Sequence, residues 1–189
     1  MKTKYPFKAI IKYIPTRYTN LEEWQVSNQK TVFNFKKGMI SDNHKQRFLT
    51  IIQNLTVNNN KEWVVAFVPA STKKKTEIRY KILYTFLKNN LSCPVYLDSI
   101  KTWKEYEPVH INGRKEYKLH SIQREHFVGK NVILIDDVIT SGQTFREVAN
   151  KLIYIGALSI YGVCFAFTIH PNKPSKYKRH EYRNDTSLK

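Results

Sequence analysis

The sequence has few cysteines, few acidic residues and no long apolar run. Its two cysteines, Cys93 and Cys164, have no metal-ligand spacing to another Cys or His, so we expect neither a zinc site nor a disulfide. No apolar stretch reaches the about 20 residues that a membrane helix needs. The first residues carry no signal-peptide pattern. We therefore expect a cytoplasmic protein without membrane contact.

The shortage of acidic residues leaves a strong positive charge. The chain has 15 Asp and Glu against 32 Lys and Arg, a formal net charge of +17. Such an excess favours polyanionic partners, which are either nucleic acid or substrates with several phosphates. Because the charge is spread along the chain, it also fits a generally basic protein with solvated lysines. Only residues 73–81 and the C-terminal tail concentrate it.

Two common phosphate-binding motifs are missing as well. There is no G-x-x-x-x-G-K-[ST] loop, which argues against a P-loop NTPase. No G-x-G-x-x-G follows an expected strand, which argues against a dinucleotide-binding Rossmann site. A receiver-type acidic pocket is also disfavoured, because its acids would stand earlier in the fold.

What the sequence does contain is an alternation of apolar runs and helical spacings. We expect strands at residues 63–68, 94–97, 132–135 and 159–168, and helices at residues 76–87 and 144–155. This order predicts an α/β fold with a mainly parallel, twisted sheet flanked by helices. Upstream, we expect a helix at residues 41–55 and strands at residues 8–14 and 31–35.

The chain divides into three expected regions. Residues 1–60 form a small N-terminal hood or appendage, residues 61–170 the core, and residues 171–189 a basic, poorly ordered tail. Within the core, the polar segment 98–130 separates two expected strands. A connection of this length in a compact domain is usually functional or mobile, so we expect a long flexible loop there.

The segment 132–144, VILIDDVITSGQT, carries the strongest chemical signal. A buried strand runs into Asp136 and Asp137, a small polar loop follows, and a helix begins. Strand carboxyl ends line the ligand crevice of open α/β sheets, and Gly142 lets the backbone approach a ligand closely. Backbone N–H groups at the helix start, together with the loop hydroxyls, make an anion site. We expect this loop to hold one phosphate.

The two acids need a different partner. Ionised carboxylates only accept hydrogen bonds, so the vicinal hydroxyls of a ribose suit Asp136 and Asp137. A bound Mg²⁺ would also tie the acidic region to a diphosphate. The alternative is that the acids merely cap the helix and the loop is a tight turn. Two adjacent carboxylates after a buried strand are costly without a use, which disfavours this alternative.

The segment 132–144 resembles the signature with which type I phosphoribosyltransferases bind 5-phosphoribosyl 1-diphosphate (PRPP). The shared pattern is an apolar strand, two acids and a Thr-Ser-Gly-x-Thr loop. The resemblance implies the type I phosphoribosyltransferase fold, with Asp136 and Asp137 as catalytic residues at the ribose hydroxyls that contact Mg²⁺ indirectly, through the ligand or water. It implies a 5′-phosphate site formed by Val138, Ile139, Thr140, Ser141, Gly142, Gln143 and Thr144.

A second stretch, Val68-Pro69-Ala70-Ser71 with the basic residues after it, is similar to the pyrophosphate loop of the competence-protein-F branch of this family. Arg79 matches the Arg of that branch and would be a catalytic residue, although Tyr80–Lys81 replaces the usual Gly-Phe. The resemblance implies a diphosphate site formed by Ala70, Ser71, Lys73, Lys74 and Arg79. The segment 98–130 stands where the family has a closing loop, whose candidate diphosphate contacts are Lys101, Lys104, His110 and Arg114.

The resemblance implies a transferase that moves phosphoribosyl from PRPP to a nitrogen acceptor, with Mg²⁺ as cofactor. The N-terminal aromatics Tyr18, Trp24, Phe33 and Phe35 either stack on an acceptor base or pack the hood. An alternative is a non-enzymatic regulator that senses PRPP or a nucleotide and binds nucleic acid through its basic surface. A homodimer is a further partner left open.

Overall fold

The computed structural model describes residues 5–57, 61–102 and 120–170. Five parallel strands form one sheet in the order β1-β7-β6-β2-β3. These strands are β1 (Phe7–Tyr13), β2 (Trp63–Phe67), β3 (Val95–Tyr96), β6 (Asn131–Ile139) and β7 (Ser159–Thr168). A short antiparallel pair, β4 (Ile100–Thr102) with β5 (His120–Ile122), stands apart from the sheet, and the 3-10 helix η1 (Arg124–His126) follows it.

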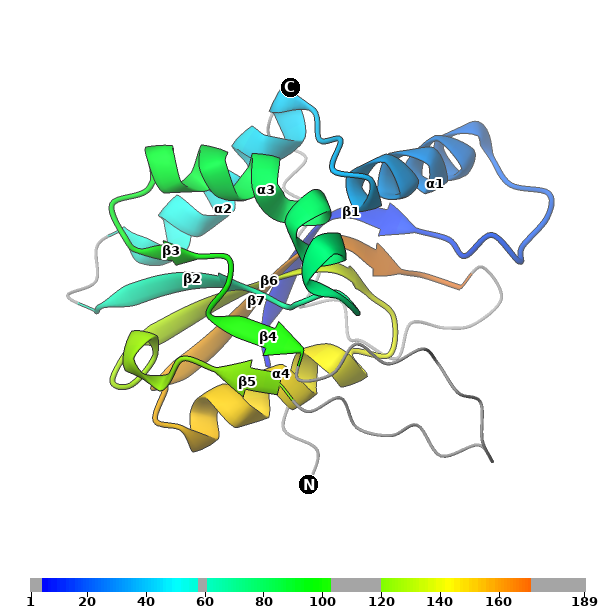
Figure 1. The fold of residues 1–189 in the computed structure, drawn as a ribbon. Helices are drawn as coiled ribbons and strands as arrows, with labels where there is room; N and C mark the ends of the chain where they lie inside the picture. Colours follow the sequence, from blue (N-terminus) through cyan, green and yellow to red (C-terminus); the bar gives the residue numbers. More distant parts are fainter. Residues whose placement is uncertain (1–4, 58–60, 103–119, 171–189) are drawn as a thin grey trace, which may run out of the picture.

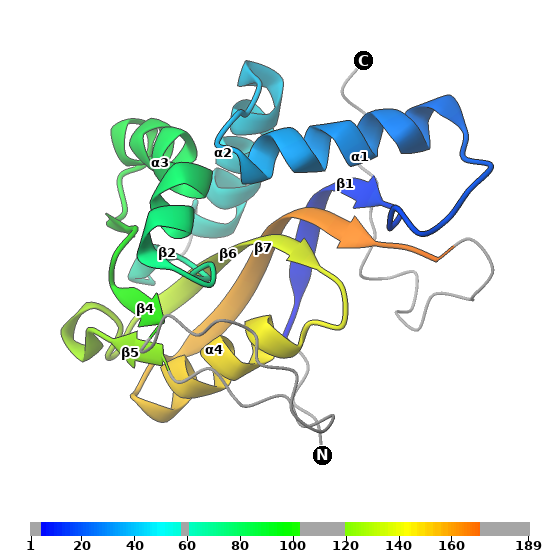
Figure 2. The ribbon, with the colours of Figure 1, turned by 45° about the vertical axis from the view of Figure 1, so that its right-hand side comes forward.

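The helices lie on both faces of the sheet, as Figure 1 shows. One face is covered by α1 (Glu23–Lys36), α2 (Asp42–Thr56) and α3 (Lys73–Asn90); α4 (Gln143–Tyr154) and the β4–β5 pair lie on the other. The turned view in Figure 2 shows the same layers. The expected mainly parallel sheet flanked by helices is therefore confirmed. Among the described residues, no helix is long and apolar enough to span a membrane.

Each face of the sheet has its own apolar core. Toward α4, Leu134 of β6 packs with Phe145 and Leu152. On the opposite face, Ile133 of β6 belongs to a second core that includes Phe35 and Phe165. The central strand β6 is thus buried on both faces, which explains its continuous apolar run.

Residues 5–57, which fall in the segment expected to be a hood, contribute to the main sheet. β1 pairs in parallel with β7, from Phe7 against Gly162 to Tyr13 against Thr168. α1 and α2 follow β1 and cover one face of the same sheet. The N-terminal region therefore supplies an edge strand and two covering helices.

The strand expected at residues 31–35 is wrong, because these residues form the end of α1. Thr31, Val32, Phe33 and Phe35 are β-branched or aromatic, which favours a strand, but Val32 and Phe35 are the buried positions, three residues apart on one helical face. The helix starts with a capping box between Glu22 and Gln25, a local signal of a helix start that the sequence prediction missed.

The other expected elements are present, with shifted ends. α3 begins at Lys73, three residues before its expected start, and β6 continues through both acids to Ile139. Residues 98–130 contain β4, β5 and η1 at their two ends. Residues 103–119, with Lys104, His110 and Arg114, and the tail 171–189 lie outside the described residues.

Candidate functional site

The strands β2 and β6 are neighbours whose connections lead in opposite directions. β2 continues through α3 to β3, whereas β6 continues through α4 to β7. The two helices lie on opposite faces of the sheet. In open α/β sheets this topology leaves a crevice at the carboxyl ends of the two strands, where ligands bind. The segments 68–72 and 140–142 both leave the sheet at this point.

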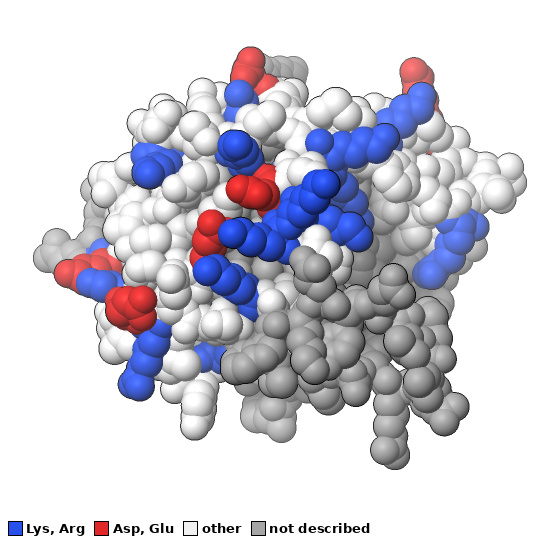
Figure 3. Space-filling model, in the orientation of Figure 1, with Lys and Arg blue, Asp and Glu red and all other residues white. Residues whose placement is uncertain are grey.

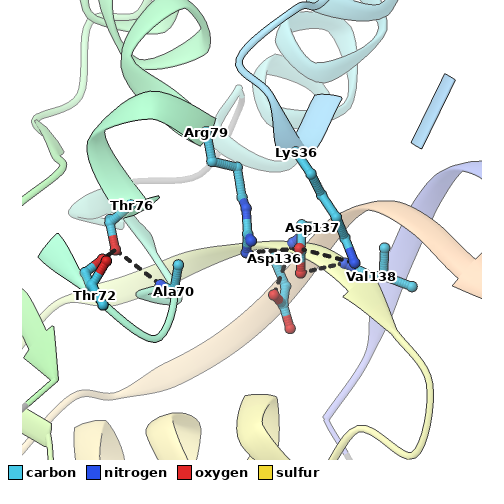
Figure 4. Close-up of polar contacts among 8 residues, drawn as sticks. All are labelled: Lys36, Ala70, Thr72, Thr76, Arg79, Asp136, Asp137 and Val138. Atoms are coloured by element: carbon cyan, nitrogen blue, oxygen red, sulfur yellow. Dashed lines mark hydrogen bonds and ion pairs between the residues drawn. The ribbon is translucent and has the colours of Figure 1, made fainter. Parts of the chain in front are cut away.

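Asp136 and Asp137 lie near the carboxyl end of β6 and point to opposite faces of the sheet, as Figure 4 shows. Asp136 stands in register with Cys164 of β7 and is only 7% exposed. Both carboxyl groups also bind the strand backbone. The Asp137 N–H donates to Asp136 Oδ1 over 2.8 Å, and the Val138 N–H donates to Asp137 Oδ1 over 2.7 Å.

The environment of Asp136 disfavours its charged form. Burial raises the pKa of Asp136 well above its ordinary value, and the neighbouring charge of Asp137 raises it further. The protonated carboxyl is therefore favoured more strongly in the fold than in water. In that form, Asp136 would offer an O–H donor as well as an acceptor.

Two cationic side chains from neighbouring helices lie next to Asp137. Arg79 Nη1 of α3 lies 2.7 Å from Asp137 Oδ2, and Lys36 Nζ at the end of α1 lies 4.0 Å from the same oxygen. The Arg79 and Asp137 side chains are only 17% and 13% exposed. Phe35 stacks on Phe165 of β7, with ring centroids 4.1 Å apart, and this contact holds the end of α1 over the acid pair.

The structure thus brings together two residues that the sequence assigned to different parts of the site. Arg79 was expected at the diphosphate and Asp137 at the ribose, and here they form an ion pair. Lys36 was not identified from the sequence. No local pattern marks it, because its position depends on how α1 packs across the sheet.

The loop between β6 and α4 carries exposed hydroxyl side chains. Thr140 and Ser141 in the loop and Thr144 in the first turn of α4 are exposed, and the Thr140 hydroxyl also hydrogen-bonds to the Thr168 hydroxyl over 3.0 Å. Gly142 adopts a left-handed backbone with φ of +66° just before the helix. Glycine is the residue that reaches this conformation most readily. The Arg146 Nη1 group donates to the Ser141 carbonyl over 2.9 Å and braces the loop from within the first turns of α4.

Three of the residues expected to bind a phosphate lie in the strand or contact another side chain. Val138 and Ile139 lie in β6 itself, and the Ile139 side chain is buried, so only its backbone is available to a ligand. Gln143 donates through Nε2 to Glu147 Oε1 over 3.0 Å. The exposed part of the expected phosphate site therefore consists of the loop hydroxyls and the start of α4.

The expected diphosphate loop leads from β2 into α3. The Ala70 N–H donates to the buried Thr76 Oγ1 over 2.9 Å, and Thr102 Oγ1 of β4 donates to the Ala70 carbonyl over 2.8 Å. Thr72 caps the helix by accepting from the Lys75 N–H. Neither Thr76 nor Thr102 was identified from the sequence, although together they fix the loop.

Exposed cations surround this loop. Lys73, Lys74 and Lys75 fill the first turn of α3, are all exposed, and have no acidic residue beside them in that turn. Lysines at a helix N-terminus oppose the helix dipole, so an anion bound there would relieve their repulsion. Figure 3 shows Lys and Arg side chains gathered over α1 and α3, with acidic side chains next to them.

No group of three or more His, Cys, Asp or Glu among the described residues could hold a metal ion. Mg²⁺ keeps several waters and takes one or two carboxylates together with phosphate oxygens. Asp136 and Asp137 fit an indirect role of this kind better than a direct ligand role, since Asp137 is already ion-paired and Asp136 is buried.

No family model and no curated protein matches the chain. Among solved structures it is similar to an allosteric regulatory enzyme of purine biosynthesis, with 17% identity and a TM-score of 0.45 over 70% of this chain and 30% of that one. The chain therefore spans less than a third of that enzyme's length.

Two further structures overlap with the chain to a similar degree. A hypoxanthine-guanine phosphoribosyltransferase from Bacillus anthracis has 17% identity and a TM-score of 0.44, over 71% of this chain and 82% of that one. An adenine phosphoribosyltransferase has 16% identity and a TM-score of 0.42, over 66% and 76%.

Proposed function

We propose that this protein binds PRPP at the carboxyl ends of β2 and β6 and transfers its phosphoribosyl group to a nitrogen acceptor. The observation that carries the proposal is the meeting of two features at the carboxyl ends of two neighbouring strands. An acid pair followed by a loop with exposed hydroxyls ends β6, and a cation-bearing loop ends the neighbouring β2.

The loop after β6 takes the 5′-phosphate in this proposal. Thr140, Ser141 and Thr144 supply exposed hydroxyl donors, and the first turn of α4 supplies backbone N–H groups. Arg146 adds a positive charge at the same place. Asp136 and Asp137, a few residues earlier, would then meet the hydroxyls of the ribose.

The diphosphate lies on the other side of the crevice in this arrangement. Ala70 and Ser71 offer backbone groups, while Lys73 and Lys74 offer exposed charges at the start of α3. Arg79 extends from the same helix toward the acid pair. Oriented cations of this kind stabilise the charge that develops on a departing diphosphate.

Mg²⁺ would be held mainly by the oxygens of PRPP, with Asp136 and Asp137 acting through the ligand or through water. When bound, it would neutralise part of the diphosphate charge.

The reaction breaks the bond between ribose C1 and the diphosphate oxygen and forms a bond from C1 to the acceptor nitrogen. The electron pair of the broken bond leaves with the diphosphate, and the nitrogen gives up its proton to the departing diphosphate or to water. The protein needs no strong side-chain base for this step. Its residues orient the ribose, exclude water and stabilise the leaving group.

The proposal is tested by measuring diphosphate release from PRPP and Mg²⁺ in the presence of a panel of purines, pyrimidines and amines. We expect release with at least one acceptor, and loss of release in the double variant Asp136→Asn, Asp137→Asn. Absence of PRPP binding, measured by calorimetry at millimolar PRPP, would refute the site assignment.

The charge of the chain favours a second candidate function. A net charge of +17, with Lys and Arg gathered over α1 and α3, suits a regulator that binds nucleic acid and uses PRPP or a nucleotide as an effector. Such a protein would bind nucleic acid with an affinity that falls steeply with salt, and would release no diphosphate with any acceptor.

A further inference from the structure

Arg79 neutralises the acid that is expected to meet the ribose, although its helix starts at the expected diphosphate loop. Arg79 Nη1 contacts Asp137 Oδ2 at 2.7 Å, and the Val138 N–H occupies Asp137 Oδ1. Both oxygens of Asp137 are therefore engaged in this structure. A ribose hydroxyl that donates to Asp137 has to compete with Arg79.

The hydrogen-bond donors of Arg79 are not all satisfied in this position. Its Nε atom is buried and makes no hydrogen bond within the part of the chain that the structure describes. A guanidinium has five N–H donors in a planar fork and matches anions that accept two bonds at once. A diphosphate offers such paired oxygens, whereas Asp137 takes only one Nη group here.

The same helix connects Arg79 to the loop after β2. Lys73 begins α3, and Arg79 lies six residues later, about 9 Å along the helix axis at about 1.5 Å per residue. Thr76 lies between them and holds the Ala70 N–H. Figure 4 shows Ala70, Thr72 and Thr76 on one side of Arg79 and Lys36 on the other, with Asp137 below. A diphosphate on this loop would therefore lie within reach of the Arg79 side chain.

We propose that Arg79 is a specificity-determining residue that pairs with Asp137, as the 2.7 Å contact shows, and releases it to ligands with a diphosphate. This inference builds on the proposed function. A diphosphate supplies a replacement anion for Arg79, so that Asp137 is freed while the guanidinium stays compensated. Ribose 5-phosphate offers no such anion at that position and must break the ion pair without compensation. The affinity difference between PRPP and ribose 5-phosphate is therefore larger than the direct contacts to the diphosphate alone would give.

The selection is measured by calorimetric titration of PRPP and of ribose 5-phosphate, each with Mg²⁺, into the full chain and its variants. In Arg79→Met, we expect PRPP to bind more weakly and ribose 5-phosphate to bind more tightly. The Kd of ribose 5-phosphate divided by the Kd of PRPP should therefore fall roughly tenfold or more. The matched control is Lys81→Met, which removes one exposed charge from the same helix. Its ratio should change by no more than about twofold.

Arg79→Lys keeps the charge and tests the inference even where Arg79→Met fails to fold. Lysine can still pair with Asp137 but cannot bind two diphosphate oxygens through a planar fork. We expect weaker PRPP binding with nearly unchanged ribose 5-phosphate binding. An unchanged ratio in Arg79→Lys, or a proportional loss of both ligands in Arg79→Met, would overturn the inference while leaving the proposed function intact. If the unmodified protein does not bind PRPP, the proposed function fails, and this inference fails with it.

Discussion

Asp136 and Asp137 are consecutive residues of β6 with opposite electrostatic surroundings. Asp137 faces α1 and α3 and has Arg79 at 2.7 Å and Lys36 at 4.0 Å. Asp136 faces the other side of the strand and makes no ion pair in the described part of the chain. Removing the charge of one of these two identical side chains is therefore expected to change the stability of the protein in the opposite direction to removing the charge of the other.

Asp136→Asn is expected to stabilise the protein at neutral pH. Burial raises the folded-state pKa of Asp136 above its unfolded value, so folding favours the protonated form. The free energy of unfolding therefore falls as the pH rises from the unfolded pKa through the folded pKa. Asparagine carries no charge and keeps the oxygen that accepts from the Asp137 N–H. Its melting temperature should exceed that of the unmodified protein by a few degrees at neutral pH.

Thermal unfolding across a pH series tests this expectation. The advantage of Asp136→Asn should disappear as the pH falls below 3.8, the ordinary pKa of an aspartic acid, where the carboxyl is protonated in both the folded and the unfolded state. A stability difference that does not vary with pH would contradict the assigned cause.

Asp137→Asn is the matched opposite case. It removes the partner of Arg79 and leaves a mostly buried guanidinium uncompensated. Removing one member of such a pair is expected to cost about 2 kcal/mol here, less than for a fully buried pair. Urea unfolding at neutral pH gives the difference directly. If both asparagine variants shift stability in the same direction, the two environments are not opposite.

Much of the fold could be predicted because it depends on local patterns. The strand at residues 63–67 and the strand at residues 159–168 are continuous apolar runs, and α4 has its apolar residues on one helical face. The acid pair and its loop were found because a buried strand that runs into two carboxylates is rare without a use.

The residues that were missed depend on tertiary contacts. Lys36 reaches Asp137 only because Phe35 stacks on Phe165, far along the sequence. Thr102 of β4 supports the loop after β2, thirty-two residues after Ala70. The β-propensity of residues 31–35 predicted a strand where the structure has a helix, because burial of one helical face outweighed that propensity.

Thr76→Val is expected to destabilise the protein by about 1–3 kcal/mol and to loosen the loop after β2. Valine has nearly the same shape as threonine but cannot accept from the Ala70 N–H, which would be left buried without its partner. Chemical denaturation measures the loss. Thr85→Val, an exposed site on the same helix, is the control and should change stability little. Equal losses at the two sites would rule out the buried hydrogen bond as the cause.

Gly162→Ala is expected to cost about 1–3 kcal/mol through overpacking. A Cβ atom at Gly162 of β7 would lie 2.7 Å from Phe145 Cζ and 2.7 Å from Phe7 Cβ. The added variant Phe145→Leu should recover part of the loss, since it removes one of the two clashes. A double-mutant cycle on the free energies of unfolding gives the coupling between positions 162 and 145. Additive effects would show that the Phe145 ring is not the obstacle.

Arg146→Met is expected to weaken binding of ribose 5-phosphate roughly tenfold while leaving the melting temperature nearly unchanged. Arg146 donates to the Ser141 carbonyl, so its loss removes both a charge and a hydrogen bond that supports the loop before α4. Lys151→Met removes a charge from the last turn of the same helix, away from the loop, and is the matched control. Titrations at low and high salt separate the two effects, because screening abolishes a general charge contribution but not a positioned one. Equal weakening by both variants, vanishing at high salt, would mean that Arg146 acts only through the overall charge of the protein.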